Sequence, residues 1–291
     1  YDINAGGQDN EMFSYVEDAE ISNVYINCLT LNSADPPTGG LIGLARGNTN
    51  ITNCIIDNLY MEVSQNAIIG EPTGGLVGRV GESESSGSGG ARISDCNVSG
   101  DIEGYPDNDA DGGVGGIVGA GYYGLTIDDC HVDATVTGWK SVGGIIGKAG
   151  DGSSSSDVII TDSTFTGRIE TEDEEIEGDW PGFAGGILGN GFRNVTIRDC
   201  DVSAVIAGWN GDPYGGTQMG GIAGHIGASG SGTVPTIDSC SFTGTVNCTA
   251  TYCGGIVGNA AYHALINNSY AAEGLVYSKS NSVGGVAGYI D

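Results

Sequence analysis

A short apolar motif bounded by glycines recurs along most of the chain. Each copy reads Gly-Gly, then Leu, Ile or Val, then a second apolar residue, then Gly. Recurrence every few tens of residues is typical of proteins built from stacked repeats. The eight copies lie 28 to 42 residues apart and begin at Gly39, Gly74, Gly115, Gly143, Gly185, Gly220, Gly254 and Gly284.

A second motif places Ile or an aromatic residue three positions before Cys. Two copies carry Ser instead of Cys, at Ser163 and Ser269. After each Cys or Ser, apolar and polar residues alternate, which predicts a strand with one buried face. The Cys copies are Tyr25 to Cys28, Ile51 to Cys54, Ile93 to Cys96, Ile127 to Cys130, Ile197 to Cys200 and Ile237 to Cys240.

The residue before each Cys or Ser is usually Asn or Asp, as at Asn27, Asn53, Asp95 and Asp129. These residues tolerate the left-handed backbone that a sharp corner requires. We therefore expect a corner at this position and three short strands in each repeat. The three are the Gly-Gly strand, the Ile strand before the corner and the Cys strand after it.

Strands this short bury their apolar faces only if successive repeats stack. The sequence thus predicts an all-β protein, a parallel β-solenoid of about eight three-stranded repeats. Residues 1–20 lack both motifs and are interpreted as an N-terminal cap or arm, with residues 21–291 as a single solenoid domain. The alternative fold is a sandwich of antiparallel hairpins, which would have to reconcile alternating strand directions with fixed motif spacing.

The repeated Gly-Gly-Leu-Val-Gly of residues 74–78, followed by Ile-Ser-Asp-Cys-Asn-Val-Ser-Gly-Asp-Ile of residues 93–102, resembles the GLUG repeat. This repeat occurs in exported prokaryotic adhesins and other large surface proteins. The resemblance covers nearly all of the chain after residue 38. It implies a β-solenoid, export and a surface role, and it implies no catalytic residues.

The net charge of −28, from 37 acidic and nine basic residues, disfavours nucleic acid and anionic membranes as partners. No apolar run approaches the roughly 20 residues that span a bilayer, so we expect no membrane span. The chain starts at Tyr1 without a charged, apolar leader, which favours a secreted protein whose signal peptide has been removed. Five sequons are candidate glycosylation sites, at Asn50, Asn97, Asn194, Asn247 and Asn267.

One acidic loop is a candidate calcium site. Asp107, Asp109 and Asp111 alternate with other residues and precede Gly112, as in the first half of a calcium-binding loop. No acid stands at the twelfth loop position, which is Val118, so a second loop would have to complete the site. The alternative is a solvated acidic loop without bound Ca²⁺, and no other cofactor is expected.

The eight cysteines lack the Cys-X-X-Cys spacing that is typical of zinc ligands, and six of them occupy the same position of the repeat. Equivalent residues on adjacent coils lie about 4.8 Å apart, within the range of Cα separations for a disulfide. The spacing predicts three bridges between coils and one within a loop, while a column of reduced, buried thiols is the alternative. The predicted pairs are Cys28–Cys54, Cys96–Cys130, Cys200–Cys240 and Cys248–Cys253.

Aromatic residues gather just beyond the Cys strands, where they could stack on sugars or pack beneath loops. The three histidines, His131, His225 and His263, occupy unrelated phases and are predicted to meet no nucleophile. The aromatic residues are Tyr105, Trp139, Trp180, Trp209, Tyr214 and Tyr252.

Two surfaces are candidates for self-assembly. The Gly-Gly strands are apolar on both faces, which predicts an outward stripe of Val118, Ile146, Leu188 and Val257 that packs on another chain or on the N-terminal segment. The first repeat lacks a Gly-Gly strand and the last repeat ends with one, so the two ends would complete one coil. The C-terminal contact residues would be Gly284, Gly285, Val286 and Ile290. In the alternative, residues 1–20 supply the missing strand themselves.

These patterns together favour a non-enzymatic extracellular or cell-surface protein that binds copies of itself to form a filament, sheath or hoop. An adhesin or glycan-binding module that contacts surface glycans is the main alternative. A polysaccharide lyase or hydrolase is a further alternative, although such enzymes need basic residues at the cleft and the chain has few.

Overall fold

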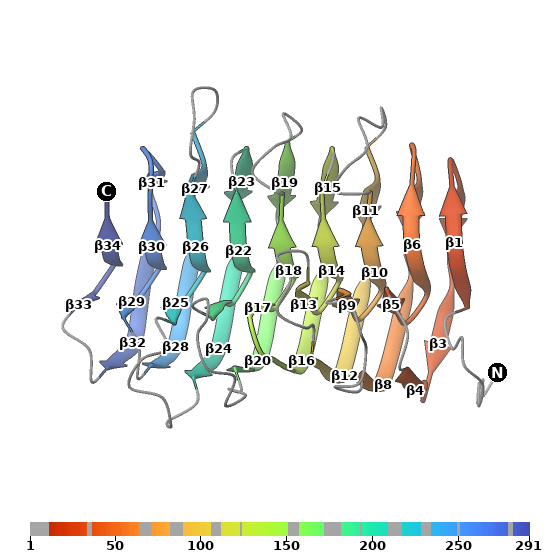
Figure 1. Cartoon of the computed structure of the whole chain (residues 1–291), viewed down its shortest axis with the longest axis horizontal. Helices are drawn as coiled ribbons and strands as arrows, with labels where there is room; N and C mark the ends of the chain where they lie inside the picture. The colour runs from red at the N-terminus through yellow and green to blue at the C-terminus, as the bar shows by residue number, and fades with distance from the viewer. Residues whose placement is uncertain are drawn as a thin grey trace.

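The computed structural model describes residues 12–33, 37–63, 71–81, 90–105, 112–122, 124–150, 157–171, 182–192, 194–208, 217–227, 234–248, 251–278 and 282–291. All regular secondary structure in these residues is β-strand. The strands form four parallel sheets, A to D, in which each strand pairs with its equivalents in the preceding and following repeats. The predicted parallel β-solenoid is therefore confirmed. Its strands stack along the long axis, with the N-terminal and C-terminal strands at opposite ends (Figure 1).

One coil consists of a strand from each sheet in the order A, B, C, D, and eight coils are followed by a ninth strand of sheet A. The strands of sheet A are β1 (Phe13–Glu17), β6 (Ile42–Arg46), β10 (Val77–Val80), β14 (Val118–Gly121), β18 (Ile146–Ala149), β22 (Leu188–Phe192), β26 (Ala223–Gly227), β30 (Val257–Ala260) and β34 (Ala287–Ile290).

Sheets B and C hold the Ile and Cys strands predicted from the sequence. Sheet B contains β2 (Glu20–Ser22), β7 (Asn50–Thr52), β11 (Arg92–Ser94), β15 (Leu125–Asp128), β19 (Val158–Thr161), β23 (Val195–Arg198), β27 (Thr236–Asp238) and β31 (Leu265–Asn267). Sheet C contains β3 (Tyr25–Asn27), β4 (Thr30–Ser33), β8 (Ile55–Val63), β12 (Asn97–Gly104), β16 (His131–Gly138), β20 (Thr164–Thr171), β24 (Asp201–Gly208), β28 (Ser241–Cys248) and β32 (Tyr270–Ser278).

Sheet D corrects the prediction of three strands per repeat, because each Gly-Gly motif forms a corner between two strands. Gly115 ends a short strand of sheet D, and Val118 begins the next strand of sheet A. The strands of sheet D are β5 (Thr38–Gly39), β9 (Thr73–Gly74), β13 (Val114–Gly115), β17 (Ser141–Gly143), β21 (Phe183–Gly185), β25 (Gln218–Gly220), β29 (Tyr252–Gly254) and β33 (Ser282–Gly284).

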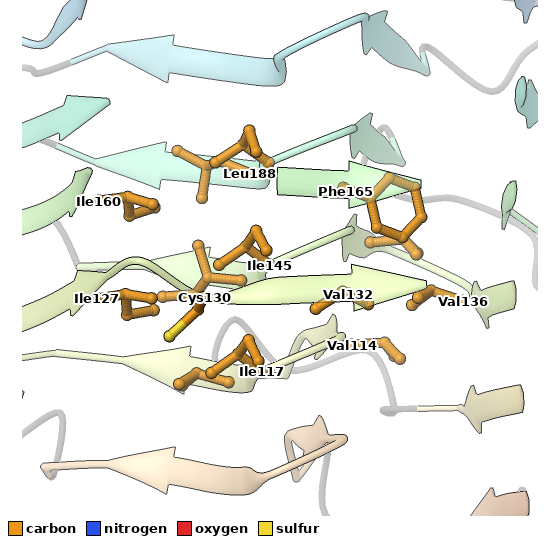
Figure 2. Packing of buried hydrophobic residues seen from close by; sticks show 14 of the residues in the cluster. Val114, Ile117, Ile127, Cys130, Val132, Val136, Ile145, Ile160, Phe165 and Leu188 are labelled. Carbon is orange, nitrogen blue, oxygen red and sulfur yellow. The ribbon is translucent and has the colours of Figure 1, made fainter. Parts of the chain in front are cut away.

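This corner also overturns the predicted outward stripe. Because the chain bends at the glycines, both apolar residues of the first seven motifs turn into the core, as Ile117 and Ile145 do beside Ile127 and Val132 (Figure 2). The four residues of the predicted stripe are fully buried and cannot contact a second chain: Val118, Ile146, Leu188 and Val257.

The predicted corner between sheets B and C is confirmed. Its residues adopt positive φ values between 46° and 59° in all eight coils, which Asn and Asp accept at lower cost than other residues. In the first coil the corner residue is Asn23 and not Asn27, so the motif assigned to Tyr25 and Cys28 was shifted by one strand. The corner residues are Asn23, Asn53, Asp95, Asp129, Asp162, Asp199, Ser239 and Asn268.

The N-terminal segment supplies the missing strand of the first coil, as the alternative interpretation of residues 1–20 predicted. Strand β1 pairs with β6 in sheet A, with Phe13 in register with Ile42, although it contains no glycine motif. The first coil is therefore complete, and the regular coil begins at Phe13 rather than after residue 20. This pairing contradicts the idea that the C-terminal strand of one molecule fills a gap in the first coil of the next.

Candidate functional site

The cysteines that follow the corner form a column buried in the core. Cys54, Cys96 and Cys130 occupy three consecutive coils, Ser163 the next, Cys200 and Cys240 two more, and Ser269 the last. The five thiols are at most 1% exposed. Each Sγ donates to the carbonyl two residues before it, at 3.1 Å for Cys96 and 3.2 Å for Cys200. The thiols of the column thus provide hydrogen-bond donors, from inside the core, to the backbone carbonyls that precede the corner.

Thiols in this column also contact their neighbours in the next coil. The backbone N–H of Cys54 donates to Sγ of Cys96 at 3.4 Å. A hydrogen bond to the Cys130 thiol, together with burial, raises the pKa of Cys96 to about 12. Hydrogen bonding between their thiols raises the pKa of Cys200 and lowers that of Cys240.

The three bridges predicted between coils are not formed, because these six cysteines are free thiols. Cys28 does not belong to the column at all. It lies exposed between β3 and β4, where its N–H donates to the Asp57 carbonyl, and Val24 occupies the place before Cys54. For Cys96–Cys130 and Cys200–Cys240, equivalent side chains repeat at the coil spacing of about 4.8 Å, which is too long for a sulfur–sulfur bond of about 2.05 Å.

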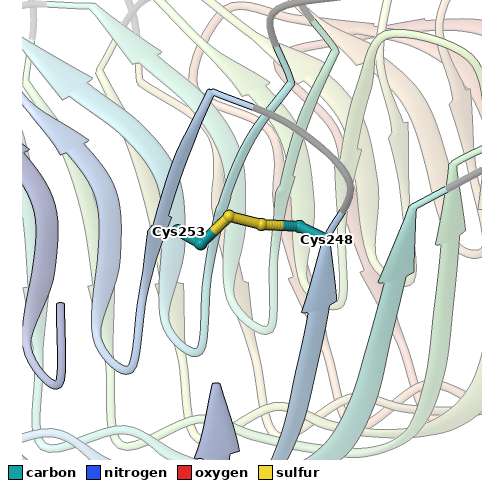
Figure 3. The surroundings of a disulfide bond; sticks show 2 residues. All are labelled: Cys248 and Cys253. Atoms are coloured by element: carbon teal, nitrogen blue, oxygen red, sulfur yellow. A yellow bond between two sulfur atoms is a disulfide. The ribbon is translucent and has the colours of Figure 1, made fainter. Parts of the chain in front are cut away.

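The fourth predicted bridge, Cys248–Cys253, is confirmed (Figure 3). It joins the end of β28 in sheet C to β29 in sheet D, with the two Cα atoms 6.6 Å apart. The bond closes the turn between these strands in the seventh coil.

Thiol reactivity should distinguish the exposed Cys28 from the five buried thiols of the column. In the native protein we expect one cysteine, Cys28, to react rapidly with an aromatic disulfide reagent, since the five column thiols are buried. Denaturation without reductant should release the remaining five. Cys28→Ser should abolish the fast phase and leave the slow one, and a native protein with several fast thiols would contradict the buried column.

Exposed carboxylates cover the outside of this column. Asp95, Asp129, Asp162 and Asp199 occupy the corner on four successive coils, and each side chain is exposed. Arg92 pairs with the partly exposed Asp128 at 2.6 Å, and Arg198 pairs with the exposed Asp199 at 3.0 Å, so water screens both contacts. The corner is consequently an acidic edge that lies one residue before the thiols.

The candidate calcium ligands, Asp107, Asp109 and Asp111, lie outside the described residues. Within the residues that the structure describes, no group of three or more His, Cys, Asp or Glu side chains is placed to hold a metal ion. The calcium site stays a prediction.

The aromatic edge is only partly described, since Trp180, Trp209 and Tyr214 lie outside the described residues. Tyr105 and Trp139 pack against each other with ring centroids 4.9 Å apart, and Tyr105 is 8% exposed. Tyr252 packs in the same way on Tyr289 of the last strand, at 4.9 Å. These rings pack against one another, so they do not form an open platform on which a sugar could stack.

His131 lies on the exposed surface, where it contacts one residue of the next coil and one of its own coil. Its Nδ1 lies 2.8 Å from the hydroxyl of Thr164, and its Nε2 lies 3.4 Å from the carboxylate of Asp129. The side chains of His131 and Asp129 are 51% and 57% exposed, so water screens their interaction. The sequence could not show this contact because Thr164 belongs to the next coil.

His225 lies in a seam where sheet A packs on sheet D. Its ring centroid is 5.5 Å from that of Phe183 and 5.8 Å from that of Phe192, and its Nδ1 lies 3.0 Å from Oδ1 of Asn190. Burial lowers the pKa of His225 to about 4. The imidazole is therefore neutral at physiological pH.

The same seam holds basic side chains against aromatic rings. Lys148 is 3% exposed, and its Nζ lies 5.6 Å from the ring centroid of Tyr122 and 5.9 Å from that of Phe192. Tyr122 and Phe192 flank Gly150 on the neighbouring coils, so the lysine amine occupies the space beside a residue without a side chain. Cation–aromatic contacts of this kind stabilise a desolvated charge. Sequence reasoning missed the seam because its members come from different coils.

The candidate glycosylation residues lie on the outer surface. Asn267 is exposed and the other four are partly exposed, on strands β7, β12 and β28 and directly before β23. Their modification stays a prediction.

Both ends of the solenoid expose apolar side chains whose equivalents elsewhere are buried. Val286 is 47% exposed, whereas Ile117, Ile145 and Ile256 at the same position in earlier coils are fully buried. Phe13 is 41% exposed at the other end, although its register partner Ile42 is fully buried. Each end surface therefore exposes apolar side chains that a further coil would cover.

None of the described elements is a helix with the length and apolar character needed to cross a membrane. Comparisons with protein-family models, curated proteins and solved structures find no match. The resemblance to the GLUG repeat therefore rests on the repeated residues themselves.

Proposed function

We propose that this chain is a non-enzymatic structural protein of the cell exterior that binds copies of itself end to end. The exposed core at the two terminal coils carries the proposal. A column of apolar residues runs unbroken through sheet A and stays buried until it reaches either end, at Phe13 and Ala287. In water these two surfaces favour a partner that continues the same column.

A second copy has the geometry to continue it. All described strand pairs are parallel, so the exposed edge at one end presents the hydrogen-bonding groups that the opposite edge of another molecule accepts. Such a contact uses different surfaces on the two molecules, and it propagates as a filament or closes as a ring according to the rotation per step. Because β1 completes the first coil, the contact joins that coil to β34, the ninth strand of sheet A.

Location outside the cell is supported by two features. A disulfide such as Cys248–Cys253 persists in oxidising compartments, and the five sequons are partly or fully exposed. A structural rather than enzymatic role is supported by the exposure of His131 and Asp129, whose side chains are 51% and 57% exposed. The buried side chains of the seam serve packing between sheets.

Charges placed on the C-terminal surface should prevent assembly. Val286→Lys together with Ile290→Lys puts two charges where an incoming coil would pack, and both positions are more than 40% exposed in the single chain. We expect the variant to remain folded and monomeric while the parent forms filaments or rings, as seen by light scattering and negative-stain microscopy.

Val205→Lys provides a matched control, since Val205 is 38% exposed on the outer face of sheet C and away from both ends. It should assemble like the parent. Normal assembly of the double variant would refute the end-to-end contact, and so would a parent that stays monomeric at high concentration.

A further inference from the structure

The stacked thiols form pairs with a repeated sulfur geometry. In Cys96, Cys130, Cys200 and Cys240, Sγ lies 3.1 to 3.4 Å from the carbonyl two residues earlier and 3.7 to 3.9 Å from the Ile carbonyl of the preceding coil. The side chains therefore share one conformation. Sulfur atoms on adjacent coils then repeat at the strand spacing of about 4.8 Å.

This separation does not suit a disulfide, but it suits a metal ion in line between two sulfur atoms. A metal–thiolate bond is about 2.3 Å long, so an ion between two thiolates holds the sulfur atoms about 4.6 Å apart. Thiolates select soft ions such as Cu(I) over hard cations.

We propose that the cysteine column binds soft monovalent metal ions in two-coordinate sites, each between thiolates on adjacent coils. One site lies between Cys200 and Cys240. The other lies in the run of Cys54, Cys96 and Cys130. It holds one ion, with Cys96 as one ligand and either Cys54 or Cys130 as the second. This proposal does not depend on assembly of the solenoid.

Binding exchanges protons for the ion. Two thiols and one monovalent cation give a bis-thiolate complex with one negative charge, and two protons leave to solvent. In the run of Cys54, Cys96 and Cys130, one backbone donor is in place for that charge, since the N–H of Cys54 donates to Sγ of Cys96 at 3.4 Å.

The acidic edge favours delivery of cations to the column. The exposed carboxylates of Asp95, Asp129 and Asp199 directly precede Cys96, Cys130 and Cys200 in the chain. Their field concentrates cations at the corner, and a local opening of one corner residue admits the ion to the thiols.

The chain contains its own evidence that serine fits the column. Oγ of Ser163 accepts from the N–H of Cys130 at 3.2 Å and donates to the Thr161 carbonyl at 2.8 Å. Ser269 repeats the arrangement, with 3.1 Å from the N–H of Cys240. Cys→Ser variants should therefore fold, because a hydroxyl makes the same contacts as the thiol.

The test uses the full chain with Cys28→Ser, which removes the exposed thiol, and keeps the Cys248–Cys253 bond oxidised. The protein is loaded with Ag(I), a redox-stable stand-in for Cu(I), and desalted against a competing chelator. We expect one retained ion in each site, with X-ray absorption showing two sulfur ligands. Because two protons are released, the apparent affinity should fall about 100-fold for each unit decrease in pH.

Adding Cys240→Ser should remove the ion from the pair alone, and adding Cys96→Ser should remove the other, while circular dichroism and melting stay as in the parent. Retention that is unchanged in both variants would overturn the proposal. Failure of the folded parent to retain any ion would do the same, as would a spectrum with nitrogen or oxygen ligands.

Discussion

Gly144→Ala is expected to lower the free energy of unfolding by about 3 kcal/mol or more, measured by denaturant unfolding. Gly144 is the second glycine of its motif, at the corner between sheets D and A. A Cβ there would overlap the backbone carbonyl of Gly186 in the next coil and Cγ of Phe165. Phe165 is fully buried, and the carbonyl belongs to the stacked backbone, so neither has room to retreat.

The last coil offers a matched control at the same motif position. A Cβ at Gly285 would meet nothing within 4 Å. Gly285→Ala in dilute solution should therefore change stability by no more than about 0.5 kcal/mol. Equal losses in the two variants would mean that the glycine is needed for its backbone freedom and not for the close approach of the next coil.

The repeating part of the fold could be predicted from the sequence because each local signal agrees with the stacking. Ile93 and Cys96 flank a corner at Asp95, as the spacing indicated, and the alternation after Cys130 marks the buried face of β16. Parallel stacking followed because the same phases recur in successive repeats.

The predictions that were wrong concern sequence patterns that fit two different structures. Two adjacent apolar residues such as Ile117 and Val118 are typical of a strand covered on both faces, but they also fit a corner at which both point inward. Strand β1 carries no motif and is recognised only by its pairing with β6. Cys28 happens to follow an aromatic residue at the motif spacing, although the corner of its coil lies at Asn23.

The candidate sites were harder to predict than the fold because their members come from different coils. The cysteine column was found, since one residue type recurs at one phase. The seam around Lys148 was not found from the sequence. Its aromatic residues, Tyr122 and Phe192, come from the neighbouring coils, and the equivalent residue in the coil of Lys148 is Gly150. Contacts of this kind depend on the register between coils rather than on any local pattern.

Acidification should destabilise the protein through His225. Burial between Phe183 and Phe192 lowers its pKa from 6.5 to about 4. Between these two values the unfolded chain binds a proton on this imidazole while the folded chain does not, so the free energy of unfolding falls as the pH decreases. The contribution is complete above about pH 6.5 and lost by about pH 4, and it amounts to about 2–3 kcal/mol.

The variant His225→Asn separates the pH dependence due to His225 from that of the carboxylates, which gain protons in the same acidic range. The register partners of His225 on the adjacent coils are Asn190 and Asn259, so asparagine fits this column of sheet A. We expect parent and variant to differ by no more than about 1 kcal/mol at pH 7, with the variant gaining about 2–3 kcal/mol on the parent as the pH falls to 4. Urea unfolding at each pH measures the difference directly. Parallel pH profiles for the two proteins would show that the folded imidazole accepts its proton as readily as the unfolded one, which would contradict its burial in the seam.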